Sequence, residues 1–274
     1  MTAAASRRIV FLDVDGTILD HGTSVAPSTI EAITTARAAG HLVYLSTGRS
    51  AGDIHPDVRA IGFDGAITNG GAFATSAGET VLARTMPVEA LAQLTEYFDG
   101  HRIHYFLQSD AGVYASAEVR HLMGEIIHPV RSGVAPSIVP EFRDLSEADR
   151  TQIAKAVFMS ESTGMVAQVQ ADLGELFHVI PGSMPLPGGT NGEVGMRGTT
   201  KGSAILHLLD RLGIDPATAI GIGDSWNDVE MFEVCGVGIA MGNAAPELQA
   251  LADEVTTSVT ADGVHNAFLR HGLL

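Results

Sequence analysis

The chain has 274 residues, enough for one large domain or two small ones, and its 45% hydrophobic and 18% charged residues are ordinary for a globular protein. Its 32 acidic and 16 basic residues give a formal net charge of −16, which disfavours nucleic acid or an anionic membrane as a partner. The single cysteine, Cys235, excludes a disulfide within the chain. Because we find no signal peptide and no uncharged stretch near the roughly 20 residues of a membrane span, we expect a soluble cytoplasmic protein.

Residues 1–83 alternate predicted strands with predicted helices. Such alternation predicts βαβ units and a parallel sheet. Each strand is followed by polar or glycine residues, which would lie at the carboxyl edge where parallel sheets bind ligands. The predicted strands are 9–12, 41–46 and 65–68, and the predicted helices are 28–39 and 50–60.

Residues 197–274 resume the same alternation. Glycine after a helical pattern and apolar strands that end in polar residues again indicate α/β structure. The predicted helices are 201–212, 227–235, 247–252 and 261–269, and the predicted strands are 219–223 and 237–240.

The segment 84–196 has a different pattern, in which a hairpin stands beside helices. Residues 109–112 are expected at the turn of this hairpin, and 129–140 and 182–192 are expected to be loops. We therefore predict a doubly wound, Rossmann-like α/β core made of 1–83 plus 197–274, with an α+β module inserted at 84–196. The predicted strands of the module are 103–108, 113–115, 153–160, 176–180 and 193–196, and its predicted helices are 88–98, 117–127 and 164–173.

The run Asp13-Val14-Asp15-Gly16-Thr17 directly follows the first predicted strand. Side chains two residues apart on an extended segment point the same way, so the two carboxylates are expected close together. Two such charges need a cation or a shared proton. The run therefore indicates part of a site, most simply one built around a metal ion.

Other polar residues are expected at the same edge of the sheet. Thr47, Asp224 and Asp228 follow core strands, and Lys201 opens a helix. Carboxylates without histidine or cysteine at metal spacing favour Mg²⁺, while a hydroxyl, a lysine and a helix N-terminus favour phosphate. Together they describe phosphoryl transfer through an aspartyl-phosphate.

Lysine is rare in this chain, which has two lysines and 14 arginines among its 16 basic residues. Lys155 lies in a predicted strand, and we expect it on a partly exposed face. Lys201 is the better candidate for a phosphate ligand, since its compact ammonium acts as a point charge.

Four motifs in order resemble those of the haloacid dehalogenase superfamily of phosphatases, and of its Cof-type branch with a type IIB cap. The resemblance covers nearly the whole chain. Met241-Gly242-Asn243-Ala244 and Ala261-Asp262-Gly263-Val264 resemble further landmarks of the family. The four motifs are Asp13-x-Asp15-Gly16-Thr17, Ser46-Thr47-Gly48-Arg49, Lys201-Gly202 and Gly223-Asp224-Ser225-x-Asn227-Asp228.

The resemblance implies a role for each motif residue. Asp13 would be the nucleophile, and Asp15 the acid that protonates the leaving alcohol and then the base that activates water. Mg²⁺ would be held by the Asp13 carboxylate, the Asp15 backbone carbonyl and Asp224, with Asp228 beside them. The phosphate would be bound by Thr47, Lys201, the N–H of Gly48 and Asn227.

Simpler interpretations stay open for single residues. Asp224 could cap a helix, and Thr47 could be an ordinary strand-end hydroxyl. Asn69 and Gly70 could form a turn or contact the substrate. Trp226 is expected to be packed, because an indole buries a large apolar area.

We expect an enzyme that hydrolyses small phosphomonoesters, most plausibly sugar phosphates, with Mg²⁺ as cofactor and the inserted module as a cap over the site. The alternatives are a phosphomutase acting on hexose phosphates and a non-catalytic regulator that binds a phosphorylated ligand. Free phosphate released from a hexose 1-phosphate would indicate the hydrolase, and the 6-phosphate the mutase. The chain is expected to be a monomer or a dimer, and the motifs leave its physiological substrate open.

Overall fold

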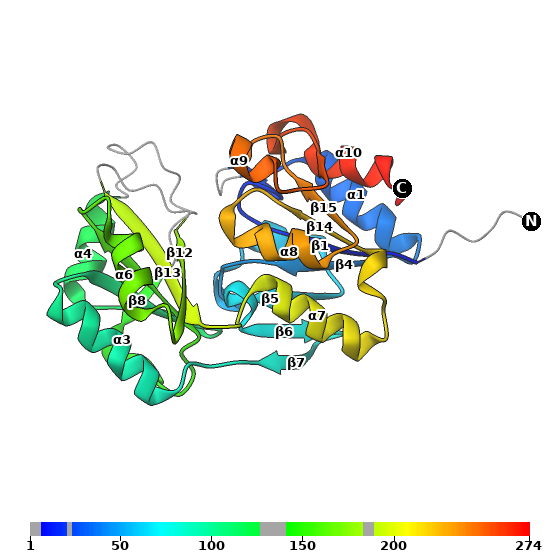
Figure 1. The fold of residues 1–274 in the computed structure, drawn as a ribbon. Helices are drawn as coiled ribbons and strands as arrows, with labels where there is room; N and C mark the ends of the chain where they lie inside the picture. The colour runs from blue at the N-terminus through cyan, green and yellow to red at the C-terminus, as the bar shows by residue number, and fades with distance from the viewer. Residues whose placement is uncertain (1–6, 21–23, 127–140, 183–188) are drawn as a thin grey trace, which may run out of the picture.

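The computed structural model of the protein describes residues 7–20, 24–126, 141–182 and 189–274, which form two lobes side by side (Figure 1). In these ranges each lobe contains one large sheet, and β2 (Leu19–Asp20) and β3 (Ser24–Val25) form a small ribbon. The loop predicted at 129–140 and part of the loop predicted at 182–192 lie outside the described residues.

The core lobe contains a sheet of eight strands within the described chain. In order across the sheet the strands are β16 (Glu254–Val255), β15 (Val237–Ala240), β14 (Ala219–Gly223), β1 (Ile9–Leu12), β4 (Leu42–Ser46), β5 (Gly65–Thr68), β6 (Phe73–Ser76) and β7 (Glu79–Ala83). Neighbouring strands are parallel from β16 to β5, and β5, β6 and β7 pair antiparallel. The predicted α/β class with a parallel sheet is confirmed, whereas the antiparallel edge was not predicted.

Strand β1 lies where the chain reverses its direction across the sheet. From β1 the chain continues to β4 and β5 on one side, and it returns later to β14, β15 and β16 on the other. The carboxyl end of β1 is therefore a topological switch point, where parallel α/β sheets leave a crevice for a ligand.

Helices cover both faces of the core sheet, as the alternating side chains of β1 show. The helices of this lobe are α1 (Pro27–Ala38), α2 (Pro56–Ile61), α7 (Lys201–Leu212), α8 (Val229–Val234), α9 (Pro246–Gln249) and α10 (Gly263–Arg270). Val10 and Leu12 pack in one buried cluster with α1 and α10, and Ile9 and Phe11 pack in another with α7 and α8.

Two predicted core helices were too long. Residues 50–60 form a 3₁₀ turn, Ala51–Asp53, and then α2, because Pro56 starts a new helix after the cap residue His55. Residues 227–235 likewise divide between the 3₁₀ turn η6 (Trp226–Asp228) and α8.

The second lobe, called the cap below, contains a sheet of six strands within the described chain. All of them lie between 104 and 196, inside the module predicted at 84–196, and the predicted domain limits themselves stay a prediction. Thr190–Met196 is one strand, so the loop predicted at 182–192 was too long at its end. The cap strands are, in order across the sheet, β10 (Phe142–Asp144), β9 (Gly112–Ala115), β8 (His104–Ser109), β11 (Lys155–Ser160), β13 (Thr190–Met196) and β12 (Phe177–Pro181), and its helices are α3 (Val88–Gly100), α4 (Ala117–Ile126) and α6 (Met165–Leu173).

The two faces of the cap sheet have different neighbours. On one face Leu107 and Phe158 pack with α3 and α6. Because strand side chains alternate, Gln108, Lys155 and Glu193 lie on the other face. Part of this other face is covered by α4 in a separate apolar cluster, and the part that carries these three polar residues meets the core. The core-facing side of the cap thus carries polar and charged groups.

The turn between β8 and β9 joins the cap to the core. Asp110 Oδ1 accepts hydrogen bonds from Ala51 N at 3.0 Å, Thr68 Oγ1 at 2.7 Å and Asn69 Nδ2 at 3.0 Å. Gln108 Nε2 of the same hairpin donates to Gly48 O at 2.8 Å. These contacts connect one cap hairpin to the ends of β4 and β5.

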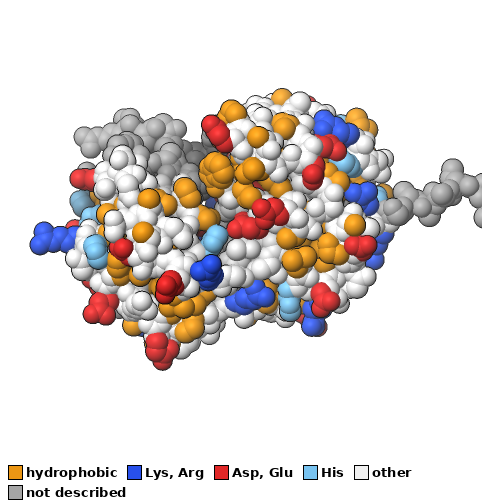
Figure 2. Space-filling view, viewed as in Figure 1, with side chains coloured by type: hydrophobic (Ala, Val, Ile, Leu, Met, Phe, Trp, Pro, Cys, Tyr) orange, Lys and Arg blue, Asp and Glu red, His pale blue; other side chains and the backbone are white. Residues whose placement is uncertain are grey.

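Charged side chains are scattered over the face drawn in Figure 2, without a large patch of either sign. In the part of the chain that the structure describes, no helix has the length and apolar character needed to cross a bilayer.

We expect Asp110→Ala to loosen the junction between the lobes, because three core donors lose one charged acceptor. Amide hydrogen exchange at Ala51 should become roughly tenfold faster or more, since hydrogen bonds to charged groups are worth about 1.5–3 kcal/mol. Asp149→Ala is the matched control, because this exposed carboxylate accepts hydrogen bonds from Thr151 within the cap. Unchanged exchange at Ala51 would contradict this role of Asp110.

Candidate active site

Asp13 lies at the switch point, one residue beyond β1. Its backbone N–H donates to Ile222 O of β14 at 2.9 Å, and the residue is 4% exposed. The following turn requires Gly16, which has a φ of +84°, and a methyl group placed there would lie 2.1 Å from Asp224 Oδ2. The glycine therefore allows the Asp224 carboxylate to approach the Asp13 loop.

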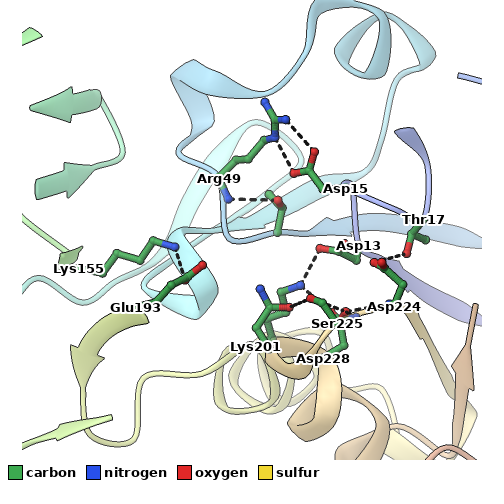
Figure 3. Close-up of polar contacts among 12 residues, drawn as sticks. Asp13, Asp15, Thr17, Arg49, Lys155, Glu193, Lys201, Asp224, Ser225 and Asp228 are labelled. Carbon is green, nitrogen blue, oxygen red and sulfur yellow. Dashed lines mark hydrogen bonds and ion pairs between the residues drawn. The ribbon is translucent and has the colours of Figure 1, made fainter. Parts of the chain in front are cut away.

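Lys201 connects Asp13 to Asp228 inside the core. Its Nζ donates to Asp13 Oδ1 at 2.7 Å and to Asp228 Oδ1 at 2.6 Å, and the three side chains are between 0% and 6% exposed (Figure 3). Burial alone would lower the pKa of Lys201, but the two carboxylates raise it above its ordinary value. Lys201 is thus a buried ammonium ion held between two buried carboxylates.

Asp228 also organises the start of α8. Its Oδ2 accepts from the backbone N–H groups of Asp224 and Ser225, each at 3.0 Å. Ser225 and Asp228 form a capping box. Both oxygens of Asp228 are therefore engaged, one by Lys201 and one by the backbone that carries Asp224.

Asp224 is oriented more loosely than Asp228. Thr17 Oγ1 donates to one of its oxygens and Asn243 Nδ2 to the other, each at 3.4 Å. Asn243 Nδ2 also donates to Gly16 O at 2.9 Å, so this residue connects the first and fourth motifs. Burial, and then the neighbouring charge of Asp228, raise the pKa of Asp224 to about 7.

The buried cluster contains more negative charge than its lysine can balance. Asp13, Asp224 and Asp228 each offer a carboxylate oxygen within 4.8 Å of the others. With Lys201 as the counter-charge, two of the three formal negative charges are left over. Burial, together with the neighbouring carboxylates, raises the pKa of Asp13 well above its ordinary value even though Lys201 opposes this. A carboxylate cluster with such an excess fits a hard divalent cation such as Mg²⁺.

Asp15 has a cation of its own. Arg49 Nε and Nη2 each donate to one oxygen of its carboxylate at 2.7 Å, and Arg49 Nη1 donates to Asp53 O at 3.0 Å. The Arg49 side chain is 9% exposed and that of Asp15 is 41% exposed. The two aspartates of the first motif, expected to need a cation or a shared proton, therefore each pair with a different cationic side chain (Figure 3). No role was predicted for Arg49, although its place two residues after Thr47 brings it to this edge of the sheet.

Thr47 and Gly48 follow β4 at the same edge. Thr47 is 1% exposed, and its Oγ1 accepts from Arg49 N at 3.1 Å, so its O–H is directed elsewhere. A methyl group placed on Gly48 would lie 3.5 Å from Asn227 Nδ2. The structure thus brings these three predicted phosphate-binding residues together.

Asn69 and Gly70 follow β5 and are tied to the same loop. Asn69 N donates to Arg49 O at 2.8 Å, and Gly70 N donates to Thr47 O at 3.0 Å. The side chain of Asn69 donates to Asp110 of the cap. These two residues therefore line the place where core and cap meet.

Two predictions about side chains were wrong. Lys155 is 6% exposed rather than partly exposed, because its strand face meets the core, and it forms an ion pair with Glu193. Trp226 is 45% exposed rather than packed, because it lies in a turn at the edge of the sheet. Glu193 and Asp110 were not predicted as site or junction residues at all.

The match to known proteins agrees with this geometry. Residues 10–268 match the model of the haloacid dehalogenase-like hydrolases. The chain belongs to this family. It is 30% identical to pyridoxal phosphate phosphatase YbhA of Escherichia coli strain K12, over 96% of this chain and 98% of the relative. With full-length relatives named as phosphatases, the chain is a phosphatase of this family.

Solved structures of the same family share the fold. The phosphatase BT1666 of Bacteroides thetaiotaomicron is 25% identical, with a TM-score of 0.80 over 98% of this chain and 96% of that one. The subclass IIB sugar phosphatase BT4131 is 22% identical, with a TM-score of 0.79 over 97% and 100% of the two chains. Both similarities extend over core and cap together.

We expect Lys201→Met to lower the free energy of unfolding by about 3–5 kcal/mol at pH 7.5 in EDTA, because it leaves two buried carboxylates without their cation. Urea unfolding measures this loss, and Arg211→Met, an exposed change in the same helix, is the control. The loss should shrink at pH 5, where protonation removes the unpaired charge. A loss below about 1 kcal/mol at pH 7.5 would show that the bridge does not hold the site together.

Proposed function

We propose that this phosphatase is a Mg²⁺-dependent hydrolase of small phosphomonoesters that works through an aspartyl-phosphate on Asp13. The observation that carries the proposal is the buried Asp13–Lys201–Asp228 bridge beside Asp224. The bridge supports the proposal because the Asp13 carboxylate, which could act as a nucleophile, lies at the switch point beside an ammonium that could bind phosphate oxygens.

In the first step an oxygen of Asp13 attacks phosphorus, and the bond from phosphorus to the leaving oxygen breaks. Asp15 donates a proton to that oxygen, so the alcohol departs neutral. In the second step Asp15 takes a proton from water, the water oxygen attacks phosphorus, and the bond to Asp13 breaks to release inorganic phosphate. Because Arg49 donates two hydrogen bonds to the Asp15 carboxylate, we propose that this contact loosens when Asp15 must carry the proton.

The phosphate oxygens would be bound by Thr47, Lys201, Asn227 and the N–H of Gly48. Asp13 and Asp224, the backbone carbonyl of Asp15 and the adjacent Asp228 would hold Mg²⁺. Once bound, the metal would reduce the repulsion between a carboxylate and a phosphate dianion.

The substrate would be a small molecule enclosed between core and cap. Relatives include one named for pyridoxal phosphate and one described as a sugar phosphatase, and we propose a sugar phosphate or a molecule of similar size. We further propose that the enzyme acts in the cytoplasm as a monomer or dimer, where a reducing medium suits its buried thiol.

Asp13→Asn should remove turnover of every phosphate ester, because an amide is a poor nucleophile, and leave the fold intact. Asp15→Asn should lower kcat by roughly 10²–10⁴-fold, the usual contribution of general acid–base catalysis. Release of inorganic phosphate with Mg²⁺ measures both, and Asp149→Asn on the exposed surface of the cap is the control. Activity retained by Asp13→Asn would refute the nucleophile assignment.

Thermal stabilisation by Mg²⁺ should grow with pH. The pKa of Asp224 is raised in the folded protein to about 7 from its ordinary 3.8. Protonation of Asp224 therefore stabilises the metal-free fold, and the metal-free fold loses this contribution as the pH rises through about 7. Mg²⁺ binds the ionised form, so the difference in Tm between Mg²⁺ and EDTA should be larger at pH 8 than at pH 5.5, by about 5 °C.

Taking the difference between Mg²⁺ and EDTA also removes the contribution of Asp53, whose pKa burial raises to about 6. Asp224→Asn should abolish most of the Mg²⁺ effect at both pH values. A Mg²⁺ effect that is equal at the two pH values in the unaltered protein would contradict the assignment.

A further inference from the structure

A cavity between core and cap begins at the catalytic lysine. Its core wall includes Lys201, Asn227 and Asn69, and its cap wall includes Lys155 and Glu193. Because Lys201 contacts Asp13, a phosphoester bound for attack by Asp13 would extend its leaving group into this cavity. Figure 3 shows Lys155 and Glu193 reaching from the cap side toward the Asp13 cluster.

Lys155 and Glu193 form a preorganised pair on the cap sheet. Lys155 Nζ donates to Glu193 Oε2 at 2.5 Å, and the two side chains are 7% and 16% exposed. They lie on the same sheet face, on the antiparallel strands β11 and β13, and Gly195 stands directly opposite Lys155. Since Gly195 has no side chain, the long lysine side chain can reach diagonally to Glu193.

The pair reaches the loop that is proposed to bind phosphate. A methyl group placed on Gly48 would lie 3.4 Å from Lys155 Nζ and 3.9 Å from Glu193 Oε1. Gln108, the strand neighbour of Lys155, donates to the Gly48 carbonyl. The atoms of the leaving group nearest to phosphorus would therefore meet this pair.

Among the residues that the structure describes, each lysine and histidine that lines the cavity has a carboxylate close to it. Lys155 faces Glu193, and Lys201 is shared by its two aspartates. His178 Nε2 lies 3.5 Å from a carboxylate oxygen of Glu230. A carboxylate on the leaving group would therefore add negative charge without gaining an unpaired cation.

Hydroxyl groups suit the same walls. Glu193 can accept from an O–H, and the ammonium of Lys155 and the amide of Asn227 can donate to its oxygen.

We infer that Lys155 and Glu193 are specificity-determining residues that select an uncharged, hydroxyl-bearing leaving group and reject one that carries a carboxylate. The inference rests on the proposed phosphatase function and adds the chemical class of its substrate. Glu193 has two functions in this inference: it accepts a hydrogen bond from a hydroxyl of the substrate, and it neutralises the charge of Lys155.

The test compares two substrates with the same carbon skeleton, glycerol 3-phosphate and 3-phosphoglycerate, with Mg²⁺ present. Wild type should have a kcat/KM at least about tenfold higher for glycerol 3-phosphate. Glu193→Gln leaves Lys155 without its counter-charge and should shift this ratio about tenfold toward the acid. Lys155→Met should shift the ratio the other way, and Glu175→Gln, an exposed change on the cap, should leave it unchanged.

Hydrolysis of p-nitrophenyl phosphate by wild type separates this inference from the proposed function. If wild type cleaves no phosphate ester, the proposed function fails and the inference with it. If wild type cleaves p-nitrophenyl phosphate but favours 3-phosphoglycerate, or if Glu193→Gln does not move the ratio, the inference alone is overturned. If a variant fails to fold, the ratio of the wild-type kcat/KM values for the two substrates still tests the inference.

Discussion

The ammonium of Lys201, buried between Asp13 and Asp228, is the interaction on which the rest of the site depends. It joins three segments that are far apart in sequence: the end of β1, the start of α7 and the turn before α8. A buried carboxylate without its cation is costly, so each segment is stable in its place only when the other two are present. The same contact that closes the core therefore brings the proposed nucleophile, Asp13, beside its proposed phosphate ligand, Lys201.

The bridge does not neutralise the cluster, and the remaining charge gives the site its chemistry. Asp224 is held near Asp13 by capping and by weak hydrogen bonds, and its raised pKa records the cost of that position. Functional sites commonly keep local instability that the surrounding fold sustains. The divalent cation proposed for the reaction would relieve this instability, so the proposed affinity for metal would follow from how the core is built.

The sequence was sufficient to predict the core of the site, because its residues follow apolar strands. Asp13, Thr47 and Asp224 could be placed at one edge from strand periodicity and the switch-point rule alone. The partner of Asp15 could not be predicted in this way. Strand β1 ends at Leu12, and Asp15 lies in the loop beyond it, where its carboxylate pairs with Arg49. The periodicity of the strands predicts which residues lie at the carboxyl edge of the sheet, whereas the orientation of their side chains depends on ion pairs with residues distant in sequence.

The cap was harder to predict for a related reason. Alternation in β11 shows that Lys155 and Phe158 lie on opposite faces, but it does not show which face meets another lobe. That depends on Asp110 and Gln108, whose hydrogen bonds hold one hairpin against the core. These contacts also bring Lys155 beside Gly48. The cap residues proposed to bind the leaving group therefore lie next to the core loop proposed to bind phosphate. The chain's two lysines would then have different roles. Lys201 in the core would bind the phosphate that reacts, and Lys155 in the cap, neutralised by Glu193, would help to select the substrate.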